Sequence, residues 1–337
     1  MSFSAAKAAA FPTRLQNPRG DRPRTNLSIR FPTDTFRSGP ALRLEPRPWP
    51  EALAQDSAPR AWWKVPRVCP WGSTGRPLCV ITFDDGWRDN YEEALPLLRR
   101  YELPATLFIS TGFMGNGRTP WFYRLGDVLH ALAGISDDRC AALRSNAQLN
   151  LPPALLAWLA GSTLQRQGDI ETVIEAMKTL PGAELESVVE RLRLLLASAG
   201  QTVNGNDAAM LDWGQVREMA QSSFEIGSHG VTHLILTQIP EQAVKAEVFE
   251  SKHCIEEELR QSVGGFAYPN GDYSEEIEAL VRTAGYRYAC TTKPGSVNLD
   301  DNPYRLNRIP LHDDITFSTP LFACHISGVF ELFRIGK

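Results

Sequence analysis

The stretch that decides the fold is LCVITFDDG, residues 78–86. Its first six residues are mostly apolar and β-branched, which is typical of a buried strand, and the run stops at two aspartates and a glycine. A segment with helical spacing follows at 90–100, and a second apolar run, ATLFI, occupies 105–109. This order of strand, helix and strand predicts the first unit of an α/β fold with a mainly parallel sheet.

The same alternation returns in the C-terminal part of the chain. There the pattern predicts strands and helices in turn, at 213–220 (helix), 224–226 (strand), 241–259 (helix), 266–268 (strand), 275–283 (helix) and 286–291 (strand). Because strands that alternate with helices pair in parallel, the sheet is either open or closed into a barrel.

Between about residues 116 and 206 the alternation stops. The sequence there is rich in Ala and Leu with helical spacing, and it is broken by Gly and Pro. We expect an α-helical insertion between two strands. Two placements stay open: a lid over the functional site, or a unit packed on the outside.

Composition excludes several classes of protein. The chain has 337 residues, of which 43% are hydrophobic and 22% charged, and this suits a folded globular protein rather than a disordered one. No apolar run approaches the 18 or so residues of a membrane helix, so we expect no integral membrane segment. The net charge of −4 argues against a nucleic-acid partner.

The N-terminal part differs from the rest. Residues 1–70 hold 12 Lys and Arg against 5 Asp and Glu, with 11 of the 24 prolines, and show no helical or alternating period. We therefore expect an irregular Pro/Arg-rich arm over 1–75, and a single domain over 76–337 that contains the helical insertion. The arm either wraps on the domain or tethers it to an anionic polymer or membrane surface. No secretory signal is visible, which favours a cytoplasmic protein and leaves peripheral membrane association or export open.

Polar clusters follow three of the predicted strands. Asp84 and Asp85 end the first, Ser228, His229 and His233 follow the strand at 224–226, and the third cluster is Tyr268, Pro269 and Asn270. Ligands of parallel α/β folds bind at the carboxyl ends of strands, so the three clusters should converge.

Their composition indicates a metal site. Two imidazoles and one carboxylate suit a divalent cation that keeps open positions for water and substrate. His229 and His233 are four residues apart in SHGVTH, so a helical turn or a tight loop would let both face one point. HxxxH is also common by chance, and the two histidines could be ordinary polar residues at a helix start. Gly230 stands where a zincin motif would need Glu.

Adjacent aspartates at a strand end can divide two roles. Because their side chains point in different directions, one can bind a metal while the other accepts a proton from water. The alternative is a solvated turn in which one aspartate caps a helix. The occurrence of Asp84 and Asp85 together with the histidine cluster favours the functional interpretation.

These motifs resemble those of the NodB-homology polysaccharide deacetylases, carbohydrate esterase family 4. TFDDG at 82–86 is similar to the first motif of that family, SHGVTH at 228–233 to the second, and FAYPNG at 266–271 to the third. The resemblance covers about residues 76–310 apart from the helical insertion. It implies a distorted (β/α)7 barrel that removes acetyl groups by hydrolysis.

The resemblance also implies the roles of individual residues. Asp84 would be the general base, and Asp85, His229 and His233 would hold one divalent metal ion, most commonly Zn, with Co or Ni as alternatives. A backbone N–H near Tyr268, in the segment with Pro269 and Asn270, would bind the oxyanion of the tetrahedral intermediate.

Two departures from the family pattern bear on the site. Many members carry in the third motif an Arg that pairs with the base, where this chain has Ala267, so we expect a different pKa for Asp84. The Arg-less form resembles the branch linked to bacterial exopolysaccharides. The late motif usually supplies a His as general acid; here His312, with Asp313 as its orienting group, is the candidate, and His325 is the alternative.

The expected function is metal-dependent N-deacetylation of N-acetylhexosamine units in a surface or extracellular polysaccharide or its precursor. The partner is then an N-acetylated polysaccharide or oligosaccharide, and the oligomeric state stays open. One alternative is a hydrolase of a small amide on the same metal site. The other is a catalytically inactive carbohydrate-binding protein on the same barrel.

Overall fold

The computed structural model describes residues 80–138, 140, 151–201, 210–222, 224–297, 300–311, 321–322 and 324. The predicted arm at 1–75 and both candidate acids, His312 and His325, lie outside these ranges. None of the helices described is both long and apolar enough to span a lipid bilayer.

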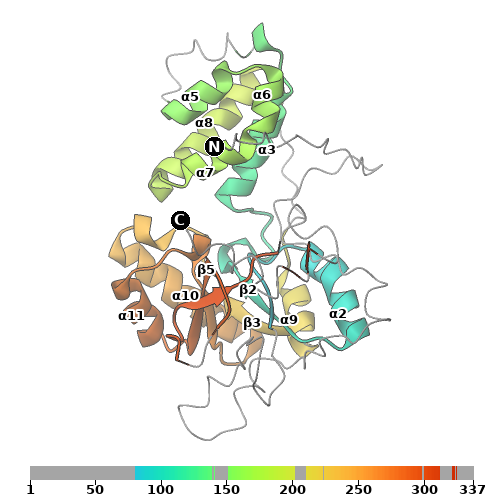
Figure 1. Ribbon diagram of the computed structural model, residues 1–337, viewed down its shortest axis with the longest axis vertical. Helices are drawn as coiled ribbons and strands as arrows, with labels where there is room; N and C mark the ends of the chain where they lie inside the picture. The colour runs from blue at the N-terminus through green and yellow to red at the C-terminus, as the bar shows by residue number, and fades with distance from the viewer. Residues whose placement is uncertain are drawn as a thin grey trace, which may run out of the picture.

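A curled parallel sheet forms the centre of the molecule (Figure 1). Each strand pairs with the next along the chain, and in the described residues six are present: β1 (Ile81–Phe83), β2 (Ala105–Ile109), β3 (Phe224–Ser228), β4 (Gly265–Ala267), β5 (Tyr288–Pro294) and β6 (Leu306–Arg308). This confirms the distorted (β/α) barrel. No sequence pattern predicted β6, which is three residues long and has only one buried side chain.

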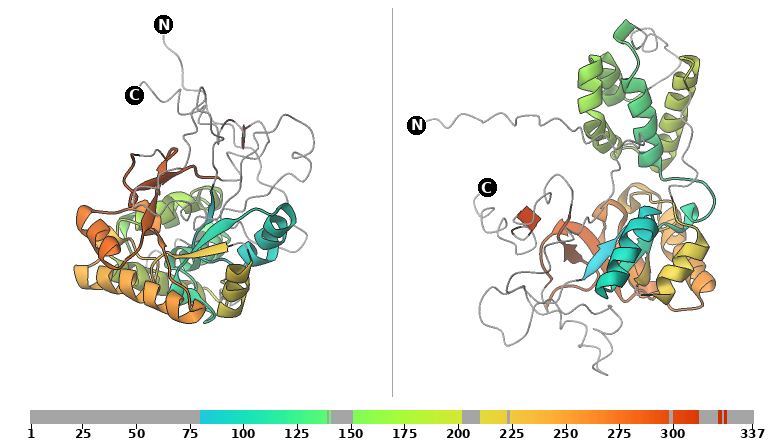
Figure 2. Two further views of the ribbon diagram at one scale, coloured as in Figure 1. Left: turned by 90° about the horizontal axis from the view of Figure 1, so that it is seen from below. Right: turned by 90° about the vertical axis from the view of Figure 1, so that its right-hand side faces the viewer.

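Helices connect the strands and cover the outer face of the sheet (Figures 1 and 2). A π-helical turn, η3 (Asn90–Ala94), leads into α2 (Leu95–Tyr101), and α9 (Trp213–Gln221), α10 (Glu241–Leu259) and α11 (Glu275–Thr283) follow. Short 3₁₀ turns are η4 (Thr111–Phe113), η6 (Leu236–Gln238) and η7 (Pro269–Gly271). Local capping explains where α9 begins, because Asp212 and Gln215 form a reciprocal capping box.

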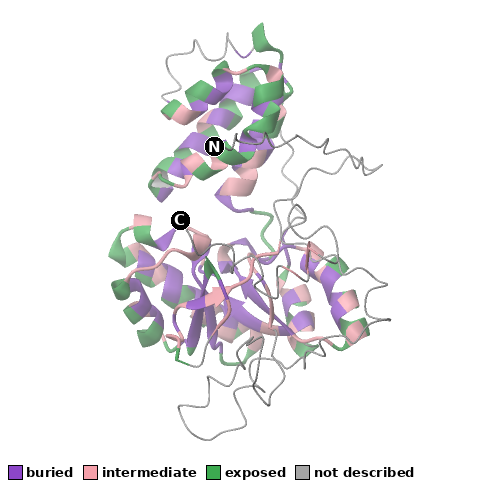
Figure 3. Ribbon diagram, viewed as in Figure 1, coloured by how far each residue is buried: buried purple, intermediate pink, exposed green. Residues whose placement is uncertain are grey.

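Alternate residues of the strands pack on opposite faces, as the two-residue period of a strand requires. Leu107 and Phe266 belong to a large core shared with the surrounding helices, whereas Phe108, Tyr288 and Cys290 form a small cluster inside the curl. Figure 3 shows the strands buried and the outer sides of the helices exposed. Both faces of the sheet are therefore covered, which leaves the strand ends as the place for a site.

The helical insertion lies between β2 and β3 and stands beside the barrel (Figures 1 and 2). Its helices pack around a hydrophobic core of their own. They are α3 (Trp121–Ala133), α5 (Pro153–Ala160), α6 (Thr163–Gly168), α7 (Ile170–Met177) and α8 (Gly182–Ser198).

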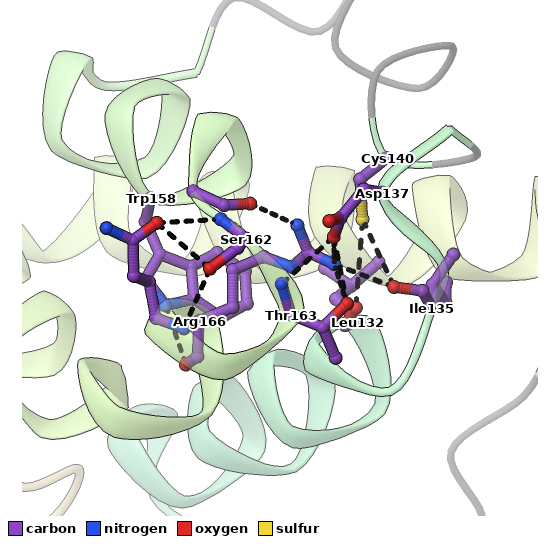
Figure 4. A network of polar contacts seen from close by, with 10 residues as sticks. Leu132, Ile135, Asp137, Cys140, Trp158, Ser162, Thr163 and Arg166 are labelled. Carbon is purple, nitrogen blue, oxygen red and sulfur yellow. Dashed lines mark hydrogen bonds and ion pairs between the residues drawn. The ribbon is translucent and has the colours of Figure 1, made fainter.

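Arg166 joins separate segments of the insertion from inside its core (Figure 4). The side chain is 1% exposed, and its guanidinium donates to the carbonyl oxygens of Gly161 (2.5 Å) and Ile135 (2.7 Å). The same group pairs with Asp137 at 3.0 Å. Acceptors from two segments, 135–137 and Gly161, therefore compensate for much of the burial of the cation.

Candidate metal centre

The first polar cluster is a tight turn after β1. Asp85 and Gly86 have φ angles of 73° and 91°, in the left-handed region, and the Gly86 N–H donates to the Asp84 carbonyl (2.9 Å). Aspartate tolerates this conformation better than most residues. The turn ends the strand and sends the two carboxylates in different directions.

The second cluster follows β3 as a loop and not as a helix. The His229 N–H continues the pairing with β2 by donating to the Ile109 carbonyl (2.8 Å), and the chain then turns through Gly230 to His233, whose φ is 57°. The turn, and not the period of a helix, brings the two imidazoles together. Their ring centroids are 4.7 Å apart.

Asp85, His229 and His233 meet at one point. One donor atom from each lies within 4.8 Å of the others. The Asp85 Oδ1 atom is 3.4 Å from His229 Nε2 and 3.1 Å from His233 Nε2. These side chains fit a divalent cation, since two imidazole nitrogens and a carboxylate oxygen are common zinc ligands and leave further positions open.

Neighbouring groups orient two of the three side chains. His229 Nδ1 lies 2.7 Å from the Ala267 carbonyl oxygen, so this nitrogen carries the proton and Nε2 is left to face Asp85. The Trp87 indole N–H donates to Asp85 Oδ2 (2.8 Å), which turns Oδ1 toward the histidines. The third motif therefore contributes a backbone carbonyl at Ala267.

Burial and charge act in opposite directions on these groups. Burial raises the pKa of Asp85. The charges and hydrogen bonds of His233 and His229 together lower it by more, so the net shift is strongly downward. For His229, burial lowers the pKa while Asp84 and Asp85 raise it, and the net shift is upward. The pocket favours positive charge between carboxylates, as a cation site requires.

Asp84 is held by a cation that the sequence analysis did not identify. Arg308 on β6 forms a two-pronged ion pair with it, with Nη1 and Nη2 each 2.7 Å from a carboxylate oxygen. Burial raises the pKa of Asp84, but the charges of Arg308 and His229 and the hydrogen bond from Arg308 together lower it more, so the net shift is downward. Because Ala267 replaces the Arg of the third motif, we expected Asp84 to lack a paired cation. Arg308 supplies that cation from another strand.

The ion pair also spans the opening of the curled sheet. Arg308 Nε donates to the Thr291 carbonyl (2.9 Å), which fixes the guanidinium on β5 and β6 while it holds Asp84 at the end of β1. The signal in the sequence was an Arg four residues before His312. It could not be interpreted without knowing that β6 lies opposite β1.

The third cluster is only partly available for oxyanion binding. The Tyr268 N–H donates to the Cys290 carbonyl (3.0 Å), and its buried hydroxyl donates to the Tyr304 carbonyl (3.0 Å). Pro269 has no N–H. Of the three predicted residues, Asn270 is the one whose N–H can still be assigned to the oxyanion, and that role stays a prediction.

The helical insertion reaches the candidate metal centre through the first turn of α3. The centroid of the Phe122 ring lies 4.9 Å from that of His233 and 6.3 Å from that of Trp87. The ring centroids of Tyr123 and Trp87 are 5.0 Å apart. Phe122 packs against the barrel core and against the insertion core. One end of the insertion is thus part of the wall of the site.

The comparisons with known proteins agree with the motifs. The family model described as polysaccharide deacetylase matches residues 72–132 and 187–289, on either side of most of the insertion. The curated Bacillus subtilis (strain 168) protein YxkH, whose name gives polysaccharide deacetylase as a provisional assignment, is 34% identical over 95 residues. That match covers 28% of this chain and about a third (34%) of YxkH.

Two of the solved structures to which the chain is similar come from Streptococcus pyogenes and Ammonifex degensii. Streptococcus pyogenes deacetylase PplD, in complex with acetate, is 19% identical with a TM-score of 0.42, over 72% of this chain and 69% of that one. IcaB from Ammonifex degensii is 16% identical with a TM-score of 0.43, over 75% and 74% of the two chains. From its three motifs and the family model, the chain is identified as a member of the polysaccharide deacetylase family.

Proposed function

We propose that this protein is a metal-dependent hydrolase that removes acetyl groups from N-acetylhexosamine units of a polysaccharide or its precursor. The observation that carries the proposal is the convergence of Asp85, His229 and His233 beside a separate carboxylate, Asp84. A ligand set and an independent base are the two parts that hydrolysis of an amide at a metal centre needs.

Asp85, His229 and His233 would hold the ion, and zinc suits this mixed oxygen and nitrogen set, with Co and Ni as alternatives. A bound divalent ion supplies Lewis acidity toward the acetamide carbonyl and toward water. Ala267 and Trp87 support the set by fixing which atoms of His229 and Asp85 face the ion.

Asp84 would accept the proton of the attacking water. Its pKa is lowered, so the carboxylate is ionised at neutral pH and can take a proton. Its side chain is 28% exposed, against 16% for Asp85 and 4% for His229, so it is the group most open to water and substrate. Arg308 keeps it in place during the reaction.

The departing amine needs a proton, because an unprotonated amine is a poor leaving group. We assign this step to His312, which follows β6 by four residues. This assignment rests on the position of His312 late in the chain. Separately, the absence of Arg from the third motif favours an exopolysaccharide as the substrate. A neutral amine then leaves as acetate is released.

The proposal is tested by acetate release from N-acetylated oligosaccharides with two matched variants. Asp84→Asn should keep the metal and lower kcat by roughly 10²- to 10⁴-fold, the usual effect of losing a general base. Asp85→Asn should lose the metal as well as the activity. Asn is suited to the left-handed backbone at this position, so the second variant changes the ligand and spares the turn.

Equal metal loss in the two variants would contradict the division of roles. Acetate release by chain stripped of metal, at the rate of the loaded chain, would contradict metal dependence. The oligosaccharides should include chitooligosaccharides, β-1,6-linked glucosamine oligomers and peptidoglycan fragments, because they differ in linkage while sharing the acetamide group.

A further inference from the structure

Glu247 lies behind the loop that joins His229 to His233. It belongs to α10 and is 5% exposed, yet its carboxylate faces the loop backbone. Oε2 accepts the N–H groups of Val231 (2.6 Å) and Thr232 (2.9 Å). Oε1 accepts from the Thr232 N–H (3.2 Å) and from the Thr232 hydroxyl.

The loop itself satisfies this buried carboxylate. No ion pair of the described residues includes Glu247, and Lys252 on the same helix pairs with Glu256 instead. A buried charge without donors is costly, so the loop conformation that presents these N–H groups is strongly preferred over others.

The two middle peptide groups of the four between the histidines are fixed at both ends. Their carbonyl oxygens, on Gly230 and Val231, accept N–H groups from Thr111 (3.1 Å) and Gly112 (2.8 Å) at the end of β2. Their N–H ends point to Glu247. Residues 230–232 of the loop are therefore held between the sheet and α10. The course of this segment determines the position of His233.

His233 depends on this backbone more than His229 does. Its Nδ1 atom is buried and has no hydrogen-bond partner among the described residues, whereas His229 Nδ1 is bonded to the Ala267 carbonyl. Its backbone is in the left-handed region. Besides its contacts with Phe122, His229 and Asp85, the direction of the loop is what places its imidazole.

Gly230 is matched to the carboxylate. Its φ is +80°, and a Cβ there would lie 2.7 Å from Glu247 Oε2. Only glycine allows both this backbone conformation and so close an approach. The Glu247 carboxylate and Gly230 therefore act together to fix the loop. The sequence alone gave no reason to connect these two residues, which are 17 positions apart.

We infer that Glu247 is a positioning residue for the metal centre: it fixes the 230–232 backbone so that His233 meets His229 and Asp85. This rests on the proposed function, because it assumes that the three side chains bind a metal. Groups behind metal ligands typically change metal affinity by about 10- to 100-fold when they are removed.

The test measures zinc affinity of the full chain by competition with a chromophoric chelator, together with the thermal unfolding of the metal-free chain. Glu247→Gln removes the charge and replaces one acceptor oxygen by an NH₂ group, so either the Val231 N–H or the Thr232 hydroxyl loses its acceptor. We expect zinc binding about 10- to 100-fold weaker. Glu250→Gln, on the exposed side of the same helix, is the control and should bind zinc as the wild type does.

Two milder variants keep the test decisive if Glu247→Gln does not fold. Glu247→Asp retains the charge and should recover part of the affinity, and Thr232→Val removes only the hydroxyl donor and should weaken binding less. Wild-type affinity in a folded Glu247→Gln, even with a lower unfolding temperature, would overturn the inference and leave a merely structural role. A wild-type chain that binds no zinc would instead overturn the metal centre, and the inference with it.

Discussion

Arg308 is the residue that keeps Asp84 ionised. Without it, burial would dominate and the pKa of Asp84 would rise. In Arg308→Met we therefore expect the acidic limb of the kcat/KM profile to move to higher pH, by about 1 to 3 units, because the base is deprotonated only at higher pH. Rates measured from pH 4 to pH 9 check this.

Arg308→Lys is the matched comparison. It keeps a positive charge but loses the two-pronged geometry, so its acidic limb should lie between those of the wild type and Arg308→Met. An unchanged acidic limb in Arg308→Met would mean that Asp84 is not the group that titrates there.

Residue by residue, the sequence indicated the candidate ligands that the structure brings together, but not the groups around them. Asp84, Asp85, His229 and His233 could be found because their types and spacing form motifs. Arg308 and Glu247 could not, because each acts through a contact across more than 15 positions of the chain. Such contacts follow from the register of the sheet and the placement of α10, which no local pattern contains.

At the scale of elements, strong periodicity made the prediction reliable. The amphipathic helix expected at 241–259 coincides with α10, and the apolar run at 105–109 coincides with β2. The strand β6 was missed because LNR has neither a clear alternation nor an apolar run. Its pairing with β5, and not its own propensity, makes it a strand.

The helical insertion should unfold locally before the barrel, because its core is separate and depends on Arg166. Arg166→Met leaves the carbonyl oxygens of Gly161 and Ile135 without their donor and breaks the pair with Asp137. We expect faster hydrogen exchange in α5, α6 and α7, with β2 and β3 still protected. Hydrogen exchange followed by mass spectrometry measures this.

The control for this prediction is Arg193→Met on α8, which removes an exposed pair with Glu190. Pairs of that kind contribute little to stability, so exchange should hardly change. Equal acceleration of exchange in the insertion and in the barrel strands after Arg166→Met would show that the two cores unfold as one unit.

For the whole molecule, Glu225 makes stability depend on pH. It lies on β3 with its side chain 9% exposed, and burial raises its pKa to about 7, although Arg287 at 4.0 Å lowers it. Between its ordinary pKa of 4.5 and about 7, the folded chain binds a proton that the unfolded chain releases. The free energy of unfolding contributed by this group therefore falls as pH rises through that range.

Glu225→Gln should remove this penalty. At pH 8 we expect the variant to be more stable than the wild type by up to about 3 kcal/mol, and near pH 4.5 the two should be similar. Denaturant midpoints at both pH values measure the difference, with the exposed Glu257→Gln as control. A stability difference that does not change with pH would contradict the assignment.

The proposed activity depends on one ion bound by Asp85, His229 and His233. The most direct measurement is anomalous scattering at the zinc edge from crystals of the chain grown with zinc. We predict one strong peak bonded to Asp85 Oδ1, His229 Nε2 and His233 Nε2 at about 2.0–2.2 Å. The absence of density between these atoms, or a zinc ion bound only by other residues, would contradict the metal centre and the mechanism built on it.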